Sequence, residues 1–269
     1  MHLNTAQKIC FWFYGGLVAF WVALHFTGLT DSVYNYLYSF LFGLIPLLAG
    51  ITGLWRFRVW GGFKSAIGKA VFFIGLGIFC WGTGETIWSY YNFILNVPAP
   101  YPSYADIFFA PSIFFYGLGT FFLSKATGAK FGLRNMTVKI LVFIAPFVIA
   151  AFSYYLLVQV ARAGVLVPAG ENALKTFLDI VYPLGDFVGL TIAVIISGLS
   201  FKYLGGKYLY DIYALLMGLG VMFIADTVFS YTTTIGTYYN ADFGDLILST
   251  GTFLLSFGLL GFYALKADD

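Results

Sequence analysis

Long runs of apolar residues, separated by short polar segments, dominate the chain. Eight runs are each about 20 residues or longer, which is enough to cross a bilayer as a helix. These runs cover residues 9–28, 34–55, 66–92, 105–124, 137–160, 175–200, 209–233 and 243–265. They are continuous and lack the alternation with period two that marks the strands of membrane barrels. The pattern therefore predicts an all-α integral membrane protein with eight transmembrane helices.

Composition supports this reading. Of 269 residues, 60% are hydrophobic and 21% aromatic, and only 10% are charged. Soluble domains carry about 25% charged residues, so this chain is too poor in charge to cover a soluble globule. We expect residues 1–269 to form a single transmembrane domain in contact with the lipid bilayer. No nucleic-acid partner is expected.

The positive charges predict the orientation in the membrane. With eight spans, almost all lysines and arginines fall on one side, in the segments between spans 2 and 3, 4 and 5, and 6 and 7, and at the two ends of the chain. Only Arg162 and Lys175 fall on the other side. Cationic loops stay in the cytoplasm, so both termini are predicted to be cytoplasmic and the protein to lie in the cell membrane.

The acids show the opposite bias and reach into the spans. At 1.5 Å per helical residue, Glu85 and Asp226 lie roughly 12 Å from the outer ends of their spans, and Asp186 roughly 16 Å. A charged side chain facing lipid costs roughly 2.5 kcal/mol or more. Glu85, Asp179, Asp186 and Asp226 are therefore expected to face the bundle interior. Asp106 lies at the outer mouth, as does Asp245.

A short pattern occurs twice. The sequence ETIWSY at 85–90 matches DTVFSY at 226–231 in residue type at every position. Each is followed by an aromatic-small-Asp triplet, YAD at 104–106 and FGD at 243–245. An even number of spans in each unit gives both the same orientation, as in parallel-repeat membrane proteins. The predicted halves are residues 1–130 and 131–269.

These residues predict an acidic, tyrosine-rich cavity open to the outside. Positions three, four and seven apart share a helix face, which groups Asp179, Tyr182 and Asp186. Carboxylates bind hard cations, and aromatic faces bind organic cations. The alternative is that the acids are protonated and only hydrogen-bond to neighbouring helices. The candidate ligand-binding residues are Glu85, Trp88, Ser89, Tyr104, Asp106, Asp179, Tyr182, Asp186, Asp226, Ser230 and Asp245.

Three motifs support a resemblance: ETIWSY at 85–90, YPSYAD at 101–106 and YPLGD at 182–186. Together they resemble the N-terminal multi-span sensor region of prokaryotic diguanylate cyclases and histidine kinases. The resemblance implies a ligand pocket that precedes a cytoplasmic output domain. This chain shows no such domain, so we expect it to act through a partner or to use the scaffold differently. The residues that the resemblance points to are Glu85, Trp88, Tyr101, Pro102, Ser103, Asp106, Tyr182, Pro183 and Asp186.

The resulting hypothesis is a non-enzymatic membrane sensor. A cation or small polar ligand would bind the cavity from outside, and the change in helix packing would reach a cytoplasmic or membrane signalling partner. Three alternatives stay open. They are a cation- or proton-coupled transporter of small solutes, an intramembrane enzyme with a metal held by paired carboxylates, and a structural subunit of a membrane complex.

Overall fold

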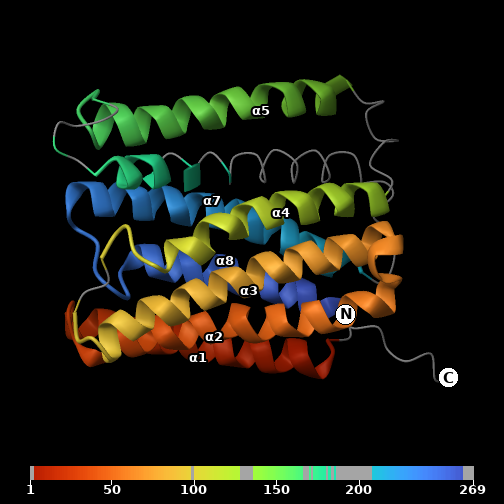
Figure 1. Ribbon diagram of the computed structural model, residues 1–269, viewed down its shortest axis with the longest axis horizontal. Helices are drawn as coiled ribbons and strands as arrows, with labels where there is room; N and C mark the ends of the chain where they lie inside the picture. The colour runs from red at the N-terminus through yellow and green to blue at the C-terminus, as the bar shows by residue number, and fades with distance from the viewer. Residues whose placement is uncertain are drawn as a thin grey trace.

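A computed structural model gives the fold of the chain (Figure 1). The structure describes residues 3–97, 100–127, 136–165 and 208–262, together with residues 170, 172–179, 181, 182 and 185. Every regular element in these ranges is helical. The long helices are α1 (Thr5–Thr27), α2 (Val33–Arg56), α3 (Ala66–Phe93), α4 (Asp106–Ala126), α5 (Met136–Tyr154), α7 (Leu209–Ile235) and α8 (Phe243–Gly261). Short 3-10 turns η1 (Phe57–Trp60) and η2 (Gly62–Lys64) follow α2, and a π-helical segment η4 (Tyr155–Val160) continues α5.

Six helices of the described part are long and apolar enough to cross a membrane, namely α1, α2 with η1, α3, α4, α7 and α8. The protein is thus a multi-pass helical membrane protein, and six of the eight expected spans are matched within a few residues. The expected fifth span, 137–160, coincides with α5 and η4. Of the sixth, 175–200, residues 175–179, 181, 182 and 185 are helical, and the remainder lies outside the described residues.

Glycines set the closest helix contacts. A β-carbon added to Gly50 of α2 would lie 2.5 Å from the backbone nitrogen of Phe79 in α3. Likewise, one added to Gly218 of α7 would lie 2.9 Å from the backbone nitrogen of Leu255 in α8. Within lipid, apolar side chains gain little by leaving their surroundings, so small residues that let backbones approach are a main source of helix association. Here they join α2 to α3 and α7 to α8.

Helix α8 lies at the centre of the bundle, in contact with α1, α2, α3 and α7. It runs antiparallel to α1. The side-chain amide of Asn4 donates to the Leu260 carbonyl oxygen at 2.8 Å, and the Trp21 indole donates to the Ala241 carbonyl oxygen at 3.0 Å. The start of α1 therefore lies beside the end of α8.

The loops α3–α4 and α7–α8 lie together at one end of the bundle, on the left in Figure 1. Glu85, Asp106, Asp226 and Asp245 lie in the helix halves that approach this end, which we call the acidic end. The opposite, basic end carries Lys8, Arg56, Arg58, Lys64, Lys69 and Lys125. This grouping matches the expected separation of charges along the bundle. Which end faces the cytoplasm stays a prediction, as do the total of eight spans and the division into halves at residues 130 and 131.

Candidate functional site

A cavity lies at the acidic end between α3, α4, α7 and α8. The space between its lining atoms is about 590 Å³, including the part open to the surroundings. Four carboxylates line it, together with seven aromatic rings and a few other side chains. The lining residues are Trp81, Glu85, Trp88, Asp106, Phe109, Ser112, Ile113, Tyr116, Tyr182, Met222, Asp226, Phe229, Tyr238, Asp245 and Leu248.

Glu85 is the acid of this set with the least compensation. Its side chain is only 6% exposed. None of the described residues makes a hydrogen bond or an ion pair with the Glu85 carboxyl group. The stem of the side chain packs on Gly43 of α2, where an added β-carbon would lie 2.5 Å from Glu85 Cγ. Since Glu85 lines the cavity, its carboxyl group is available to accept a hydrogen bond from a ligand there.

Asp245, in the first turn of α8, is held by three donors. The Ala241 backbone N–H donates to Oδ2 at 2.7 Å, the Ser39 hydroxyl from α2 to the same oxygen at 3.3 Å, and the Tyr238 hydroxyl to Oδ1 at 3.3 Å. The helix itself is capped by Asp242, whose Oδ1 accepts from the Asp245 N–H at 2.9 Å. The cap fixes where α8 begins and so fixes Asp245 at the cavity wall.

Asp106, in the first turn of α4, is held in a similar way. Its Oδ2 accepts from the Ser103 backbone N–H at 2.6 Å, and its Oδ1 accepts from the Tyr182 hydroxyl at 2.5 Å. Both Asp106 and Tyr182 are buried and line the cavity. Since Tyr182 lies 76 residues further along the chain, this bond ties α4 to the helical segment that follows η4.

A cluster of aromatic rings lies at the cavity, on the side of the α3–α4 and α7–α8 loops. The ring of Phe229 in α7 makes edge contacts with Trp88, Tyr101 and Tyr238, at centroid distances of 6.2, 5.5 and 5.0 Å. Trp88 and Tyr238 are 6.1 Å apart. These four residues, Trp88, Tyr101, Phe229 and Tyr238, form what we call the aromatic cover. Electron-rich ring faces beside carboxylates are suited to hold a cation.

The buried side-chain amide of Asn240 fixes the α7–α8 loop. Its Oδ1 accepts from the Trp88 indole at 2.9 Å and the Asn92 amide at 3.4 Å, and at 3.2 Å it shares the single Ser39 hydroxyl hydrogen with Asp245. Its backbone oxygen accepts from the Asn35 amide at 3.1 Å. Sequence reasoning missed Asn240, and a lone Asn in a polar loop gives no signal of this role.

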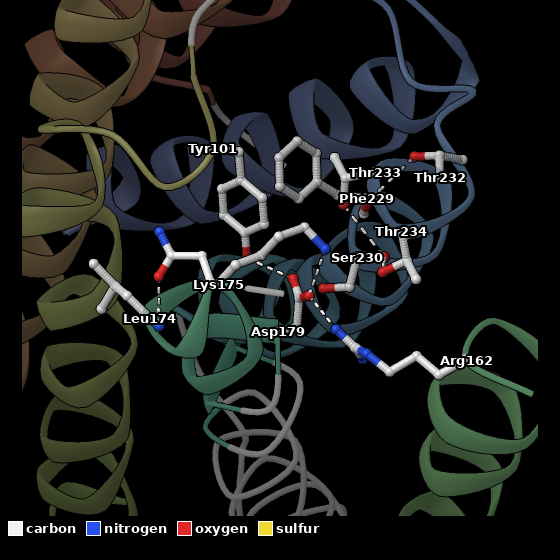
Figure 2. Close-up of polar contacts among 11 residues, drawn as sticks. Tyr101, Arg162, Leu174, Lys175, Asp179, Phe229, Ser230, Thr232, Thr233 and Thr234 are labelled. Carbon is white, nitrogen blue, oxygen red and sulfur yellow. Dashed lines mark hydrogen bonds and ion pairs between the residues drawn. The ribbon is translucent and has the colours of Figure 1, made fainter. Parts of the chain in front are cut away.

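Asp179 lies outside the cavity lining, contrary to the expectation that it joins the other acids there. It is fully buried and contacts Arg162 and Lys175, the two cations assigned to the outer side (Figure 2). The Lys175 Nζ lies 3.2 Å from Asp179 Oδ2, and the Tyr101 hydroxyl donates to Oδ1 at 2.7 Å. Asp179 is thus an ion-paired residue that anchors the α3–α4 loop, because its charge is compensated locally.

The remaining candidates are dispersed. The Tyr104 side chain in the α3–α4 loop is 72% exposed and points away from the cavity. Tyr101 is the tyrosine of the same loop that turns inward. Ser89 and Ser230 are buried, but they do not line the cavity and their hydroxyls have no hydrogen-bond partner. Asp186 and Pro183 lie outside the described residues. The structure therefore brings together Glu85, Trp88, Asp106, Tyr182, Asp226 and Asp245 of the predicted set.

Burial and nearby acids disfavour negative charge on the loop side chains above the cavity. Burial, followed by Asp179, raises the pKa of Tyr101 well above its usual range. Burial, followed by Asp245 and Glu85, does the same for the pKa of Tyr238. Burial also raises the pKa of Asp242, although backbone N–H groups oppose the shift. The tyrosines therefore remain neutral hydroxyl donors across the physiological range.

Among the residues that the structure describes, no group of three or more His, Cys, Asp or Glu side chains is close enough to hold a metal ion. Comparisons with protein-family models, with curated proteins and with solved structures found no match. The resemblance to sensor regions of cyclases and kinases therefore stays a prediction.

Proposed function

We propose that this protein is a membrane sensor that binds an organic cation in the acidic-end cavity and passes the signal to a partner. In this proposal it has eight spans, and both termini lie in the cytoplasm. One observation carries the proposal. Four carboxylates and seven aromatic rings line one cavity, and no lysine, arginine or histidine is among the described residues that line it. Such a wall is complementary to an ammonium group, whose charge the carboxylates balance and whose methylene or methyl groups the rings contact.

The apolar region that adjoins the cavity toward the middle of the bundle favours a sensor over a transporter. Tyr116 separates the cavity from a second, smaller void of about 220 Å³. This second void is lined by apolar side chains and one threonine, namely Ile74, Thr120, Leu123, Leu215, Leu216, Leu219 and Leu255. A cation moving inward would have to leave its carboxylates for this apolar region, at a large desolvation cost. A ligand that stays in the cavity can instead shift the packing of α3, α4, α7 and α8.

A transporter is the second candidate, favoured by one observation. Equivalent residues of the two similar segments, Glu85 and Asp226, line the same cavity. Many transporters place their substrate sites at the interface of such repeats. Uptake of a radiolabelled organic cation into liposomes would select this candidate over the sensor.

The binding proposal is tested by thermal stability of the purified protein in detergent, measured with a panel of organic cations, simple metal salts and neutral analogues. We expect a saturable rise in melting temperature with organic cations, since a ligand that binds only the folded state stabilises it. Glu85→Gln should abolish the rise. Asp211→Asn is the matched control, because Asp211 is also a buried acid but bonds Gln7 at the basic end. A panel without any shift in the wild type would refute the proposal.

A further inference from the structure

The carboxyl groups at the cavity receive unequal numbers of hydrogen bonds. A carboxylate offers about four acceptor positions. Asp245 accepts from one backbone N–H and from two side-chain hydroxyls, one of which it shares. Asp106 accepts from a backbone N–H and a tyrosine hydroxyl. Glu85 accepts nothing from the described residues, although it lines the same cavity and is only 6% exposed. Its acceptor positions are therefore left open by the protein.

Donors around Glu85 are directed to other acceptors. Trp88 follows three residues later on the same face of α3, and its indole N–H donates to Asn240 Oδ1 at 2.9 Å. The Ser39 hydroxyl of α2 is shared between Asn240 and Asp245. Protonation of Glu85 would not supply a partner, because a protonated carboxyl group adds a donor that itself needs an acceptor. In either protonation state, Glu85 has no hydrogen bond to the described part of the chain.

Aromatic side chains flank Glu85 on its own helix. Trp81 and Trp88 lie four residues before it and three residues after it, so all three share one face of α3. Both indole rings are buried and line the cavity with Glu85. The stem of Glu85 packs on Gly43 of α2, where an added β-carbon would lie 2.5 Å from Glu85 Cγ. A group that binds Glu85 therefore needs hydrogen-bond donors of its own, carried on an apolar remainder.

We infer that Glu85 is the specificity-determining residue of the cavity and that it selects a primary ammonium group, whose N–H bonds its carboxylate accepts. This inference rests on the proposed function and specifies its ligand class. A primary ammonium has three N–H donors, and a quaternary ammonium has none. The quaternary ion would balance charge but leave the acceptors of Glu85 buried and unfilled, which is costly. Sites built to bond an N–H group discriminate strongly against analogues that lack it.

The aromatic cover favours the same selection. Sites for quaternary ammonium ions surround the cation with ring faces. Here the Phe229 ring meets three neighbouring rings of the cover at interplanar angles of 72, 80 and 76°. Trp88 and Tyr238 meet at 81°. In such contacts the edge of one ring points at the face of the next, so part of the face area is already used within the protein. Hydrogen bonding to Glu85 is then the stronger means of discrimination.

Isothermal titration of the purified protein in detergent tests this inference with benzylamine and its N-methyl, N,N-dimethyl and N,N,N-trimethyl derivatives. All four are monovalent cations at neutral pH, and each added methyl group removes one N–H donor. We expect affinity to fall along the series, with benzylamine bound at least about tenfold more tightly than benzyltrimethylammonium.

An isomer of one member separates the loss of donors from the gain in size. Cumylamine carries two methyl groups on carbon, and N,N-dimethylbenzylamine carries them on nitrogen, so the two have the same atoms and charge. Cumylamine keeps all three N–H donors, and we expect it to bind at least about tenfold more tightly than its isomer.

Variants assign this preference to Glu85. Glu85→Asp keeps the charge but withdraws the carboxylate by one methylene, and it should bring the affinities of the two isomers together. Asp211→Asn is the matched control, because Asp211 is a buried acid at the basic end that bonds Gln7. This control should leave the preference unchanged. Melting temperatures without ligand show that each variant is folded.

The outcomes separate the inference from the proposed function. If the two isomers bind with equal affinity, the inference is overturned while the organic-cation site stands. If Glu85→Asp keeps the full preference, another group selects the ligand and the inference also fails. If no compound of the series binds, the inference is wrong, and the thermal-stability panel then decides whether a different organic cation uses the cavity.

Discussion

The α3–α4 region and the α7–α8 region use the same side chains in the same ways. Thr86 and Thr227 each donate to the backbone oxygen four residues earlier, at 2.9 and 2.8 Å. Asp106 and Asp245 each lie in the first turn of a helix, and each accepts hydrogen bonds from a backbone N–H and from a tyrosine hydroxyl. The two regions therefore share these individual hydrogen bonds, and the division of the chain into two repeats stays a prediction.

The two regions differ in what holds their loops. The α7–α8 loop is secured inside the bundle, where Asn240 accepts bonds from α2 and α3. The α3–α4 loop is held by a separate segment of the chain, because Tyr101 bonds Asp179. Asp179 is in turn paired with Arg162 and Lys175 (Figure 2). Neutral amide bonds fix one side of the cavity, and a charged cluster on a sequence-distant segment fixes the other. The same motif is thus anchored by two different kinds of interaction.

The largest effect is expected from Asp179→Asn, which removes the charged anchor of the α3–α4 loop. Loss of one member of a buried ion pair costs about 3–5 kcal/mol. Chemical denaturation in mild detergent should show a loss of stability of this order. Lys175→Met is the matched control, since its side chain is partly exposed and should cost under about 1 kcal/mol. Equal losses in both variants would mean that the Asp179 cluster is not a buried anchor.

A smaller effect is expected from Asn240→Ala, which removes the neutral anchor of the α7–α8 loop. Donors left buried without an acceptor, the Trp88 indole foremost, cost about 1–3 kcal/mol each, so we expect a loss of about 3 kcal/mol in the same assay. Tryptophan fluorescence should change with it. The exposed amide Gln159, changed to alanine, is the control and should be near neutral. A neutral Asn240→Ala would show that the loop is held by other contacts.

The smallest effect is expected from Ser89→Ala and Ser230→Ala, made at equivalent positions of the two regions. Both hydroxyls are buried and make no hydrogen bond. Removing an unsatisfied buried polar atom is neutral or stabilising, so each change should lie within about 0.5 kcal/mol of the wild type or raise stability. A loss above about 1 kcal/mol in either variant would reveal a partner for that hydroxyl and break the equivalence.

Much of the fold and part of the candidate site follow from the sequence. Continuous apolar length predicts helices, and six of the expected spans match helices able to cross a membrane. Helix periodicity and depth place Glu85 and Asp226 toward the bundle interior, and both line the cavity. In the α3–α4 loop the candidate set contains Tyr104, which is exposed, whereas Tyr101, to which only the resemblance points, bonds Asp179. Loop direction depends on backbone turns that periodicity does not describe.

The sequence by itself determined that this is a multi-pass helical membrane protein whose acids gather toward one end of the bundle, because burial of apolar length and the cost of charge in lipid act on each span separately. Tertiary structure alone decided which acids share the cavity. Glu85, Asp106, Asp226 and Asp245 line it, and Asp179 instead pairs with Arg162 and Lys175. The physical reason is that helix partners are set by contacts between distant residues, such as Gly43 with Glu85 and Tyr182 with Asp106. Those contacts depend on how whole helices pack, which no local pattern records.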